Sequence, residues 1–466
     1  MLFNSIEFLI FFPIVTLFYF ICPHKIRWIL LLISSCIFYS YFIPIYILIL
    51  FVIIIIDYLA GIKIEKSNNK KFYLTISLVA NISILCFFKY YNFFLENLNV
   101  VSGFNVALLK FALPIGLSFH TFQAMSYTIE VYKGRTKAEK HLGLYALYVM
   151  FYPQLVAGPI ERPQNILPQL RIRQKFILSN FTQGISLMIW GFFKKLVIAD
   201  RLSVYVNIIF ENPDQYHSLN LIIGAVFFSI QIYCDFSGYS DIAIGSARVM
   251  GFSLMTNFNY PYFAKSIKEF WGRWHISLST WFRDYVYFPL GGNRISSQIT
   301  ARNTLIIFIL SGFWHGANWT FIFWGLIHGI LVVFESFAST RKSHFHIPVF
   351  LKHLFVCTAV TIAWIYFRAP SIDIANNYII GIFTNSHLQF QQILKNSQGI
   401  IVFPKASMLF SALGIVYLFI SEKIKISHLH QSKTKGLKEG IFTMFTLLII
   451  IYFGIYHHNS FIYFQF

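Results

Sequence analysis

The stretch IYILILFVIIIIDYLA, residues 45–60, decides the fold class of this chain. It is almost continuously apolar, and similar runs recur from one end of the sequence to the other. These runs are residues 72–88, 221–234, 304–314, 321–334 and 441–456. Several reach or approach the roughly 20 apolar residues that a helix needs to cross a bilayer core. Because continuous runs favour helices over the alternating strands of a barrel, the sequence predicts an all-α polytopic membrane protein.

The composition agrees with this class. Of the 466 residues, 57% are hydrophobic and only 12% are charged, whereas soluble domains carry about 25% charged residues. The net charge of +19 comes from basic residues that cluster between the apolar runs, which indicates cytoplasmic loops and not a nucleic-acid surface. The five cysteines are scattered and mostly lie inside apolar runs. This favours buried packing over a disulfide framework or a metal site, so no metal is expected.

The basic clusters predict the orientation in the membrane. They lie at residues 25–27, 63–71, 133–140, 162–175, 341–352 and 423–438, and each is expected on the cytoplasmic side. One span precedes the first cluster and one follows the last, so both termini are expected on the outer, periplasmic side, with about 12 transmembrane helices. Residues 1–22 lack a basic start and a cleavage site, and we interpret them as the first span and not as a signal peptide.

Two intervals do not read as simple spans. Residues 141–159 are apolar but lie between basic loops, which predicts a re-entrant hairpin, and residues 235–292 mix charges, aromatics and glycines without a clean apolar window. Irregular backbone at membrane depth is tolerated only when protein or a cavity surrounds it. No internal repeat is visible, and one membrane domain is expected over residues 1–466. Its expected parts are N-terminal helices (1–140), a catalytic core (141–370), and C-terminal helices with a periplasmic tail (371–466).

Three polar stretches carry the candidate functional groups, because ionisable side chains at membrane depth are costly. They are residues 231–245, with Asp235 and Asp241; residues 270–285, with Arg273, His275, Arg283 and Asp284; and residues 311–320, with Trp314, His315 and Asn318. From the basic edge at Arg302, a helix reaching His315 rises about 20 Å, which places His315 deep in the membrane at a predicted helix break. A neutral imidazole there is able to accept a proton from a hydroxyl.

Purely structural roles for the same residues remain alternatives. His315 could be a core histidine that is hydrogen-bonded to a helix backbone, and the charges around His275 could form a cluster of ion pairs that anchors the helix bundle. If that patch is helical, Arg273 and Ser277 share a face and Arg283 belongs to a later turn. For His120 and His328, which lie in apolar surroundings, packing is the favoured reading.

The second and third stretches resemble the signature regions of the membrane-bound O-acyltransferase family. The likeness is greatest to the bacterial branch that O-acetylates alginate, peptidoglycan and related envelope polysaccharides. It extends over residues 151–159, 235–245, 257–261, 364–369 and 461–466. The resemblance implies a ring of helices around a central tunnel that crosses the membrane. His315 matches the family's active-site histidine, and His275 matches its second histidine.

The resemblance also implies a reaction. An acetyl or other acyl group from a cytoplasmic thioester, on coenzyme A or an acyl carrier, crosses the bacterial inner membrane to O-acetylate an envelope polysaccharide of peptidoglycan or alginate type. His315 would be the general base, and His275 would orient a reacting group or stabilise the oxyanion. The supporting residues are expected to be Asn318, Trp314, Arg273, Arg283, Asp284 and Asp235. The expected partners are a periplasmic acetyltransferase or esterase-like protein, the polysaccharide and the lipid bilayer, with no nucleic acid and no bound cofactor.

Three other functions remain alternatives. A transporter could move an acylated substrate without bond chemistry, although no inverted repeat is visible. Teichoic-acid D-alanyl transfer and a scaffold for a periplasmic partner are the others. The aromatic residues 461–466 could anchor the last helix at the interface. Alternatively Tyr463 could be the first acyl acceptor, because a phenol with a pKa near ~10 leaves more readily than an alcohol.

Overall fold

The computed structural model describes residues 1–103, 105–110, 112–156, 158–340, 347–388, 394–395, 401–428, 435–456 and 461–462. These residues are mostly helical, which confirms the predicted all-α class; β1 (Leu394–Lys395) and β2 (Ile401–Phe403) form one short antiparallel pair. The chain packs as two compact units. Unit 1 comprises Met1–Met188 and Tyr239–Thr256, and unit 2 comprises Ile189–Gly238 and Asn257–Phe466. A unit of packing need not fold independently, so the single domain over 1–466 stays a prediction.

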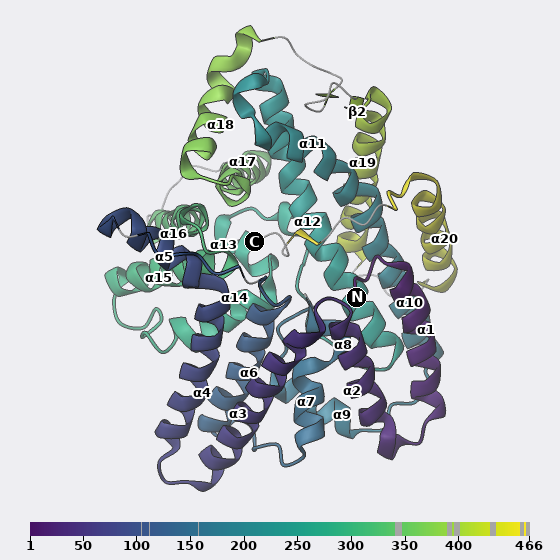
Figure 1. Cartoon of the computed structure of the whole chain (residues 1–466). Helices are drawn as coiled ribbons and strands as arrows, with labels where there is room; N and C mark the ends of the chain where they lie inside the picture. The colour runs from purple at the N-terminus through teal and green to yellow at the C-terminus, as the bar shows by residue number, and fades with distance from the viewer. Residues whose placement is uncertain are drawn as a thin grey trace. The chain divides into compact units, whose positions relative to one another are not determined.

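Unit 1 is built from the N-terminal helices. In chain order its elements are α1 (Ile6–Ile21), α2 (His24–Ser40), η1 (Pro44–Tyr46), α3 (Ile47–Lys66), α4 (Lys70–Leu85), η2 (Cys86–Tyr90), α5 (Tyr91–Ser102), α6 (Leu117–Tyr132), α7 (Leu142–Met150), α8 (Tyr152–Leu155), α9 (Pro163–Arg171) and most of α10 (Leu178–Phe192). Helices α3, α4 and α6 pack on one another (Figure 1). The basic turns between α1 and α2 and between α3 and α4 lie at the same end of the unit (Figure 1), as the charge pattern predicts.

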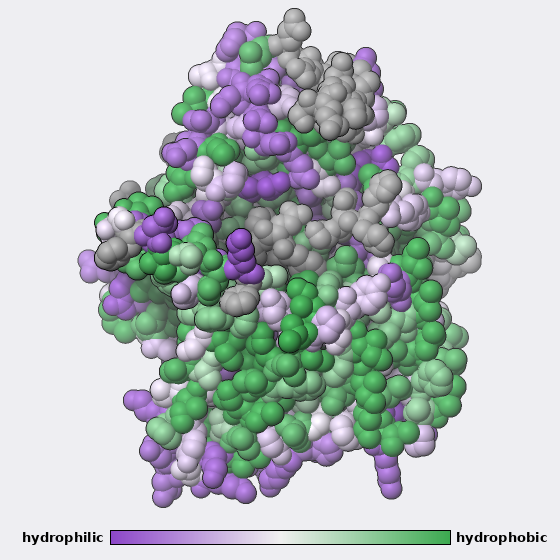
Figure 2. Space-filling view, viewed as in Figure 1, coloured by the Kyte–Doolittle hydropathy of each residue, from purple (hydrophilic) through white to green (hydrophobic). Residues whose placement is uncertain are grey.

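The outer face of unit 1 has the polarity of a lipid-facing surface. Figure 2 shows apolar side chains over α1, α3 and α4, with polar side chains gathered beyond the ends of these helices. Exposed residues on these helices include Ile6, Leu9, Leu48 and Val52. In water such a surface would be a large apolar patch, whereas in lipid it costs nothing.

Unit 2 contains the remaining elements. They are η3 (Phe193–Ala199), α11 (Asp200–Glu211), η4 (Pro213–Gln215), most of α12 (Ser218–Val249), η5 (Pro261–Phe263), α13 (Ile267–Arg273), α14 (Ile276–Phe282), η6 (Arg283–Tyr287), α15 (Ser297–His315), α16 (Trp319–Thr340), α17 (Val349–Arg368), α18 (Ile372–Thr384), η7 (Asn385–His387), β1, β2, α19 (Lys405–His428) and α20 (Lys435–Phe453).

Helices α15 and α16 form a tightly packed hairpin in unit 2 (Figure 1). A Cβ atom at Gly312 would lie 2.1 Å from the backbone oxygen of Phe321, and one at Gly325 would lie 2.2 Å from that of Phe308. Because no side chain fits at these distances, the two glycines allow the helix backbones to touch. Small residues serve the same purpose at other helix contacts in membranes.

The lengths of the helices bear on the expected spans. Among the described residues, six helices are long and apolar enough to cross a membrane: 44–66, 70–102, 218–249, 319–338, 349–368 and 405–425. The expected total of about 12 therefore stays a prediction. Residues 141–156 contain the short helices α7 and α8, neither of which is long enough to cross a bilayer, and the re-entrant hairpin over residues 141–159 stays a prediction. The prediction for residues 235–292 is wrong in its first part, because α12 continues as a regular helix to Val249.

Candidate active site

His275 lies at a sharp bend between α13 and α14. Its backbone is left-handed, with φ at +44°, a conformation that is uncommon outside glycine. The bend is held by Asn257, whose backbone oxygen accepts a hydrogen bond from the N–H of Ile276 at 2.9 Å. The patch is therefore not one helix, so the condition under which Arg273 and Ser277 would share a face is not met: the left-handed residue separates α13 from α14.

The side chain of Asn257 also fixes the tautomer of His275. Its Oδ1 accepts hydrogen bonds from the backbone N–H of Ser277 at 3.3 Å and from the Ser277 hydroxyl at 2.9 Å. Because a backbone N–H only donates, this atom of Asn257 is the amide oxygen. His275 Nδ1, 3.1 Å from the same oxygen, must then carry the proton. The neutral ring consequently presents Nε2 as a hydrogen-bond acceptor.

His315 is the last residue of α15, and the chain breaks before α16 begins at Trp319. This confirms the predicted helix break. The imidazole is 4% exposed and packs among aromatic rings, with centroid distances of 5.0 Å to Trp314, 5.2 Å to Trp324 and 5.4 Å to Phe367. This aromatic surround limits the orientations that the ring can adopt.

Asn318 organises the break and not the imidazole itself. Its Oδ1 accepts from the backbone N–H of Thr320 at 3.0 Å, which caps the start of α16, and its Nδ2 donates to the backbone oxygen of Pro370 at 3.0 Å. The side chain therefore ties the break beside His315 to the turn between α17 and α18.

The two candidate histidines lie close together in unit 2. Their ring centroids are 6.3 Å apart, and His275 is 1% exposed. The ring of Trp314 lies near both, at 6.2 Å from His275. Two imidazoles at this separation can act on one small group between them. One accepts a proton while the other holds the same group in place.

The predicted charged residues near His275 form ion pairs with neighbours in their own segments. Arg273 Nη2 lies 2.7 Å from Glu269 Oε1 along α13, and Arg283 Nε lies 2.9 Å from Asp284 Oδ1. Partial burial opposes ionisation of Glu269, but hydrogen bonds from the Lys265 amide and Arg273 outweigh it and lower the pKa of this carboxyl. Within the described part of the chain, the bonds of Arg273 and Arg283 do not reach either histidine.

Arg283 instead lines a cavity of about 450 Å³ bounded by α13, α14, η6, α15 and α16. Lys268 contributes a second cation, and Ser279, Thr280 and Ser311 contribute hydroxyls. Ser311 lies about one helical turn before His315 on α15. This cavity therefore combines positive charge with a wall that leads along α15 towards the histidine pair.

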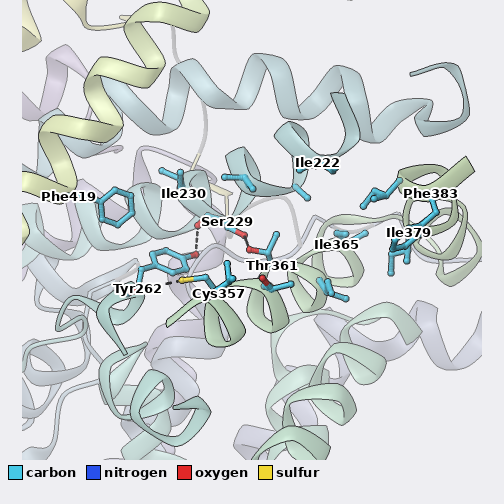
Figure 3. A pocket seen from close by; sticks show the side chains of 16 residues that line it. Ile222, Ser229, Ile230, Tyr262, Cys357, Thr361, Ile365, Ile379, Phe383 and Phe419 are labelled. Carbon is cyan, nitrogen blue, oxygen red and sulfur yellow. Dashed lines mark hydrogen bonds between the residues drawn. The ribbon is translucent and has the colours of Figure 1, made fainter. Parts of the chain in front are cut away.

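A larger cavity of about 530 Å³ lies elsewhere in unit 2, between α12, α17 and α18 (Figure 3). Its polar groups bond to one another: Ser229 donates to Thr361 at 3.0 Å, and the Tyr262 hydroxyl donates to the backbone oxygen of Ser229. None of the residues that line it is a predicted site residue. We therefore do not place the chemistry there.

Asp235 belongs to a buried ion cluster that was not predicted from the sequence. The Nζ atom of Lys195 lies 2.8 Å from Asp235 Oδ1 and 2.9 Å from Asp200 Oδ1, and all three side chains are at most 4% exposed. The other carboxylate oxygen, Oδ2, accepts from the backbone N–H of Ile462 at 2.8 Å. A signal was present, because Lys194 and Lys195 interrupt an apolar run, but their partners are distant in sequence.

His328 and His120 fit the prediction that they are packing residues. His328 accepts from the indole N–H of Trp271 at 3.3 Å and lies among aromatic rings, and His120 is buried in unit 1. Tyr463, the possible acyl acceptor, lies outside the described residues.

Comparisons with known proteins agree with the resemblance. The sequence profile of the membrane-bound O-acyltransferase family matches residues 67–375. The chain is 38% identical to the probable alginate O-acetylase of Azotobacter vinelandii over 80% of this chain and 76% of that protein. It is 36% identical to the peptidoglycan O-acetyltransferase of Helicobacter pylori, over 75% and 72% respectively. It is 30% identical to the teichoic acid D-alanyltransferase of Bacillus subtilis, over 50% of this chain and 62% of that protein.

Proposed function

This chain belongs to the membrane-bound O-acyltransferase family, and from that premise we propose that it acetylates a hydroxyl acceptor of the cell envelope with a thioester donor. The observation that carries the proposal is the buried histidine pair, with ring centroids 6.3 Å apart. Both imidazoles lie in unit 2 within the residues that match the family. A pair of this kind suits proton transfer in a site from which bulk water is excluded.

In the proposed reaction His315 is the general base. It takes the proton of the acceptor hydroxyl while the hydroxyl oxygen attacks the thioester carbonyl. The new C–O bond forms, the C–S bond breaks, and the thiolate takes up the proton to leave as a thiol. General-base catalysis of this type contributes about 10²–10⁴-fold to the rate.

His275 is proposed to orient the acceptor. With its proton fixed on Nδ1 by Asn257, the neutral ring accepts a hydrogen bond at Nε2 and does not donate one there. Of the two roles predicted for this residue, orientation of the acceptor through a donor group other than the reacting hydroxyl fits better than stabilisation of the oxyanion, because the single proton of that hydroxyl goes to His315. An imidazolium would be needed for the second role.

The donor is proposed to enter by the cavity of about 450 Å³ that contains Lys268 and Arg283. Thioesters of coenzyme A and of acyl carrier proteins both carry phosphate, and Lys and Arg are the side chains that bind phosphate. This side is proposed to be cytoplasmic, with both chain termini on the opposite side of a bacterial inner membrane.

The acceptor is proposed to be an envelope polysaccharide of alginate or peptidoglycan type, because the alginate and peptidoglycan enzymes match more than two thirds of the chain. A periplasmic acetyltransferase or esterase-like protein would receive the acyl group. D-Alanyl transfer to teichoic acid is the second candidate, supported by the weaker match to that enzyme. Tyr463 is proposed to be the first acceptor of the acyl group, which it would hold until transfer to the periplasmic protein.

Substitution of His315 tests the proposal. His315→Ala is expected to abolish acetyl transfer to envelope polysaccharide while the amount of protein in the membrane stays near normal. The matched control is His120→Ala, which removes an equally buried imidazole from unit 1 and should keep the transfer rate per molecule. Retention of half or more of the wild-type rate in His315→Ala would exclude the general-base role. A transporter that makes no bonds would still move its substrate.

A further inference from the structure

The described chain returns to the body of unit 2 after its last helix. Arg201 donates to the backbone oxygen of Phe453 at 2.6 Å, and the N–H of Ile455 donates to the backbone oxygen of Leu196 at 3.0 Å. Further along, Phe461 and Ile462 are 1% and 2% exposed. An interfacial anchor would place these side chains in lipid, whereas here they are enclosed by protein.

The segment formed by Phe461 and Ile462, hereafter the returning segment, is bound by a carboxylate. Asp235 divides its two oxygens between Lys195, at 2.8 Å, and the backbone N–H of Ile462, also at 2.8 Å. A buried carboxylate is stable only when charge or hydrogen bonds compensate it. Lys195 also binds Asp200, at 2.9 Å, and the N–H of Ile462 adds a second compensating contact to Asp235.

The returning segment also touches the wall of the histidine site. Phe236, the residue after Asp235 on α12, lies 5.6 Å from the ring of Phe461 and 4.6 Å from the ring of His275. Phe236 therefore contacts both the returning segment and His275. Docking of the segment and the shape of the site are linked through Phe236.

We propose that Asp235, held by Lys195, is a positioning residue that docks the returning segment beside His275 for acyl transfer. The role follows from connectivity, because consecutive Cα atoms are about 3.8 Å apart and docking of Ile462 limits where the next residue can reach. That residue is Tyr463, the acyl carrier of the proposed function, on which this inference rests. Asp235 itself does not take part in the bond-making step.

The hydrogen bond can be removed without touching Asp235. Ile462→Pro eliminates the N–H that Asp235 binds, whereas Ile462→Val keeps it and is the matched control. On the other side of the contact, Asp235→Leu removes the acceptor and leaves Lys195 and Asp200 as a balanced pair. Asp235→Asn retains an oxygen acceptor and should rescue docking.

Docking is measured apart from catalysis. A reporter cysteine in Phe461→Cys is treated with a membrane-permeant maleimide, and peptide mass spectrometry gives the labelling rate at that position, with the native cysteines as internal references. Ile462→Pro and Asp235→Leu, each combined with the reporter, should raise this rate about tenfold, as expected for loss of a charge-assisted hydrogen bond. Without the reporter, both should lower acetyl transfer per molecule by a similar factor, while Ile462→Val and Asp235→Asn stay docked.

The outcomes separate this inference from the proposed function. Unchanged labelling in Ile462→Pro would show that Asp235 does not dock the segment. Increased labelling with unchanged or faster transfer would show that the segment is docked but has no part in the reaction, and would overturn the positioning role. If His315→Ala retains transfer, the proposed function fails, whatever the labelling shows.

Discussion

Two buried aspartates in apolar helices have opposite surroundings. Asp57, on α3 in unit 1, accepts from the Ser77 hydroxyl at 2.6 Å and from the Asn81 amide at 2.9 and 3.0 Å. The Ser77 hydroxyl also lies 2.9 Å from Thr128 Oγ1. Asp235, on α12 in unit 2, is paired with the cation of Lys195 and with the N–H of the returning segment.

The partners of these two aspartates distinguish a structural role from a functional one better than their depth in the membrane does. Ser77 and Asn81 lie on α4 and Thr128 on α6, so the Asp57 cluster joins three neighbouring helices with neutral groups. Hydrogen bonds inside such a bundle hold helices together. Asp235 instead binds the cation of Lys195 and the backbone of the returning segment, which is distant from it in sequence. Both residues are ionisable groups in apolar sequence, and by depth alone both would be functional candidates.

Substitution of His275 in unit 2 should reduce acetyl transfer far more than substitution of a buried polar residue in unit 1. His275→Ala is expected to reduce acetyl transfer by about 100-fold, the size of loss expected when a reacting group is no longer held in position. Asn257→Ala should have a smaller effect of the same kind, because the tautomer of His275 is then no longer fixed. The rate per molecule in membranes measures both. A fall in protein amount with an unchanged rate would make Asn257 a structural residue, like Ser77 in unit 1.

The donor cavity should give an intermediate effect that depends on donor concentration. Lys268→Gln and Arg283→Gln each remove a cation from the cavity of about 450 Å³. We expect KM for the thioester to rise about 3- to 10-fold with kcat nearly unchanged, because binding to phosphate is lost in ground state and transition state alike. Lys25→Gln, which removes a cation from unit 1, is the matched control. An unchanged KM in both variants would place the donor elsewhere.

Asp57 should have the smallest effect on catalysis. Asp57→Leu leaves Ser77 and Asn81 without their buried acceptor and should lower stability by about 1–3 kcal/mol, seen as a reduced Tm in detergent. Asp57→Asn, which keeps the shape and one acceptor, should lose less. The transfer rate per folded molecule is expected to be unchanged in both. A reduced rate at an unchanged Tm would mean that Asp57 also serves the reaction, and the contrast with Asp235 would disappear.

The local sequence pattern was sufficient to predict part of this fold. The apolar runs predicted the helical class, and the residues after His315 predicted the break between α15 and α16, because both signals lie within a few residues of each other. The contacts of His275 could not be predicted in this way. Its partner Asn257 is 18 residues away, and a left-handed histidine has no sequence signature.

Ion pairs between residues distant in sequence were the part of the site that could least be predicted. Lys195 and Asp235 were both visible as charges in apolar sequence, yet only Asp235 was singled out, and nothing local connects them. Asp57 was passed over although it lies in the very run that decided the fold class. Charge pairing of this kind depends on which helices become neighbours, and periodicity within one helix does not contain that information.

The contact between the backbones of α15 and α16 has a consequence for the lipid around the protein. Gly312 and Gly325 bring the two main chains together, and His315 lies within one turn of Gly312. The position of His315 is therefore determined by its packing against α16 and not by its depth in the bilayer. Membranes of different thickness tilt or shift their helices, but a hairpin joined at its backbones moves as one body. His315 should keep its alignment with Trp324 on α16 when the thickness of the membrane changes.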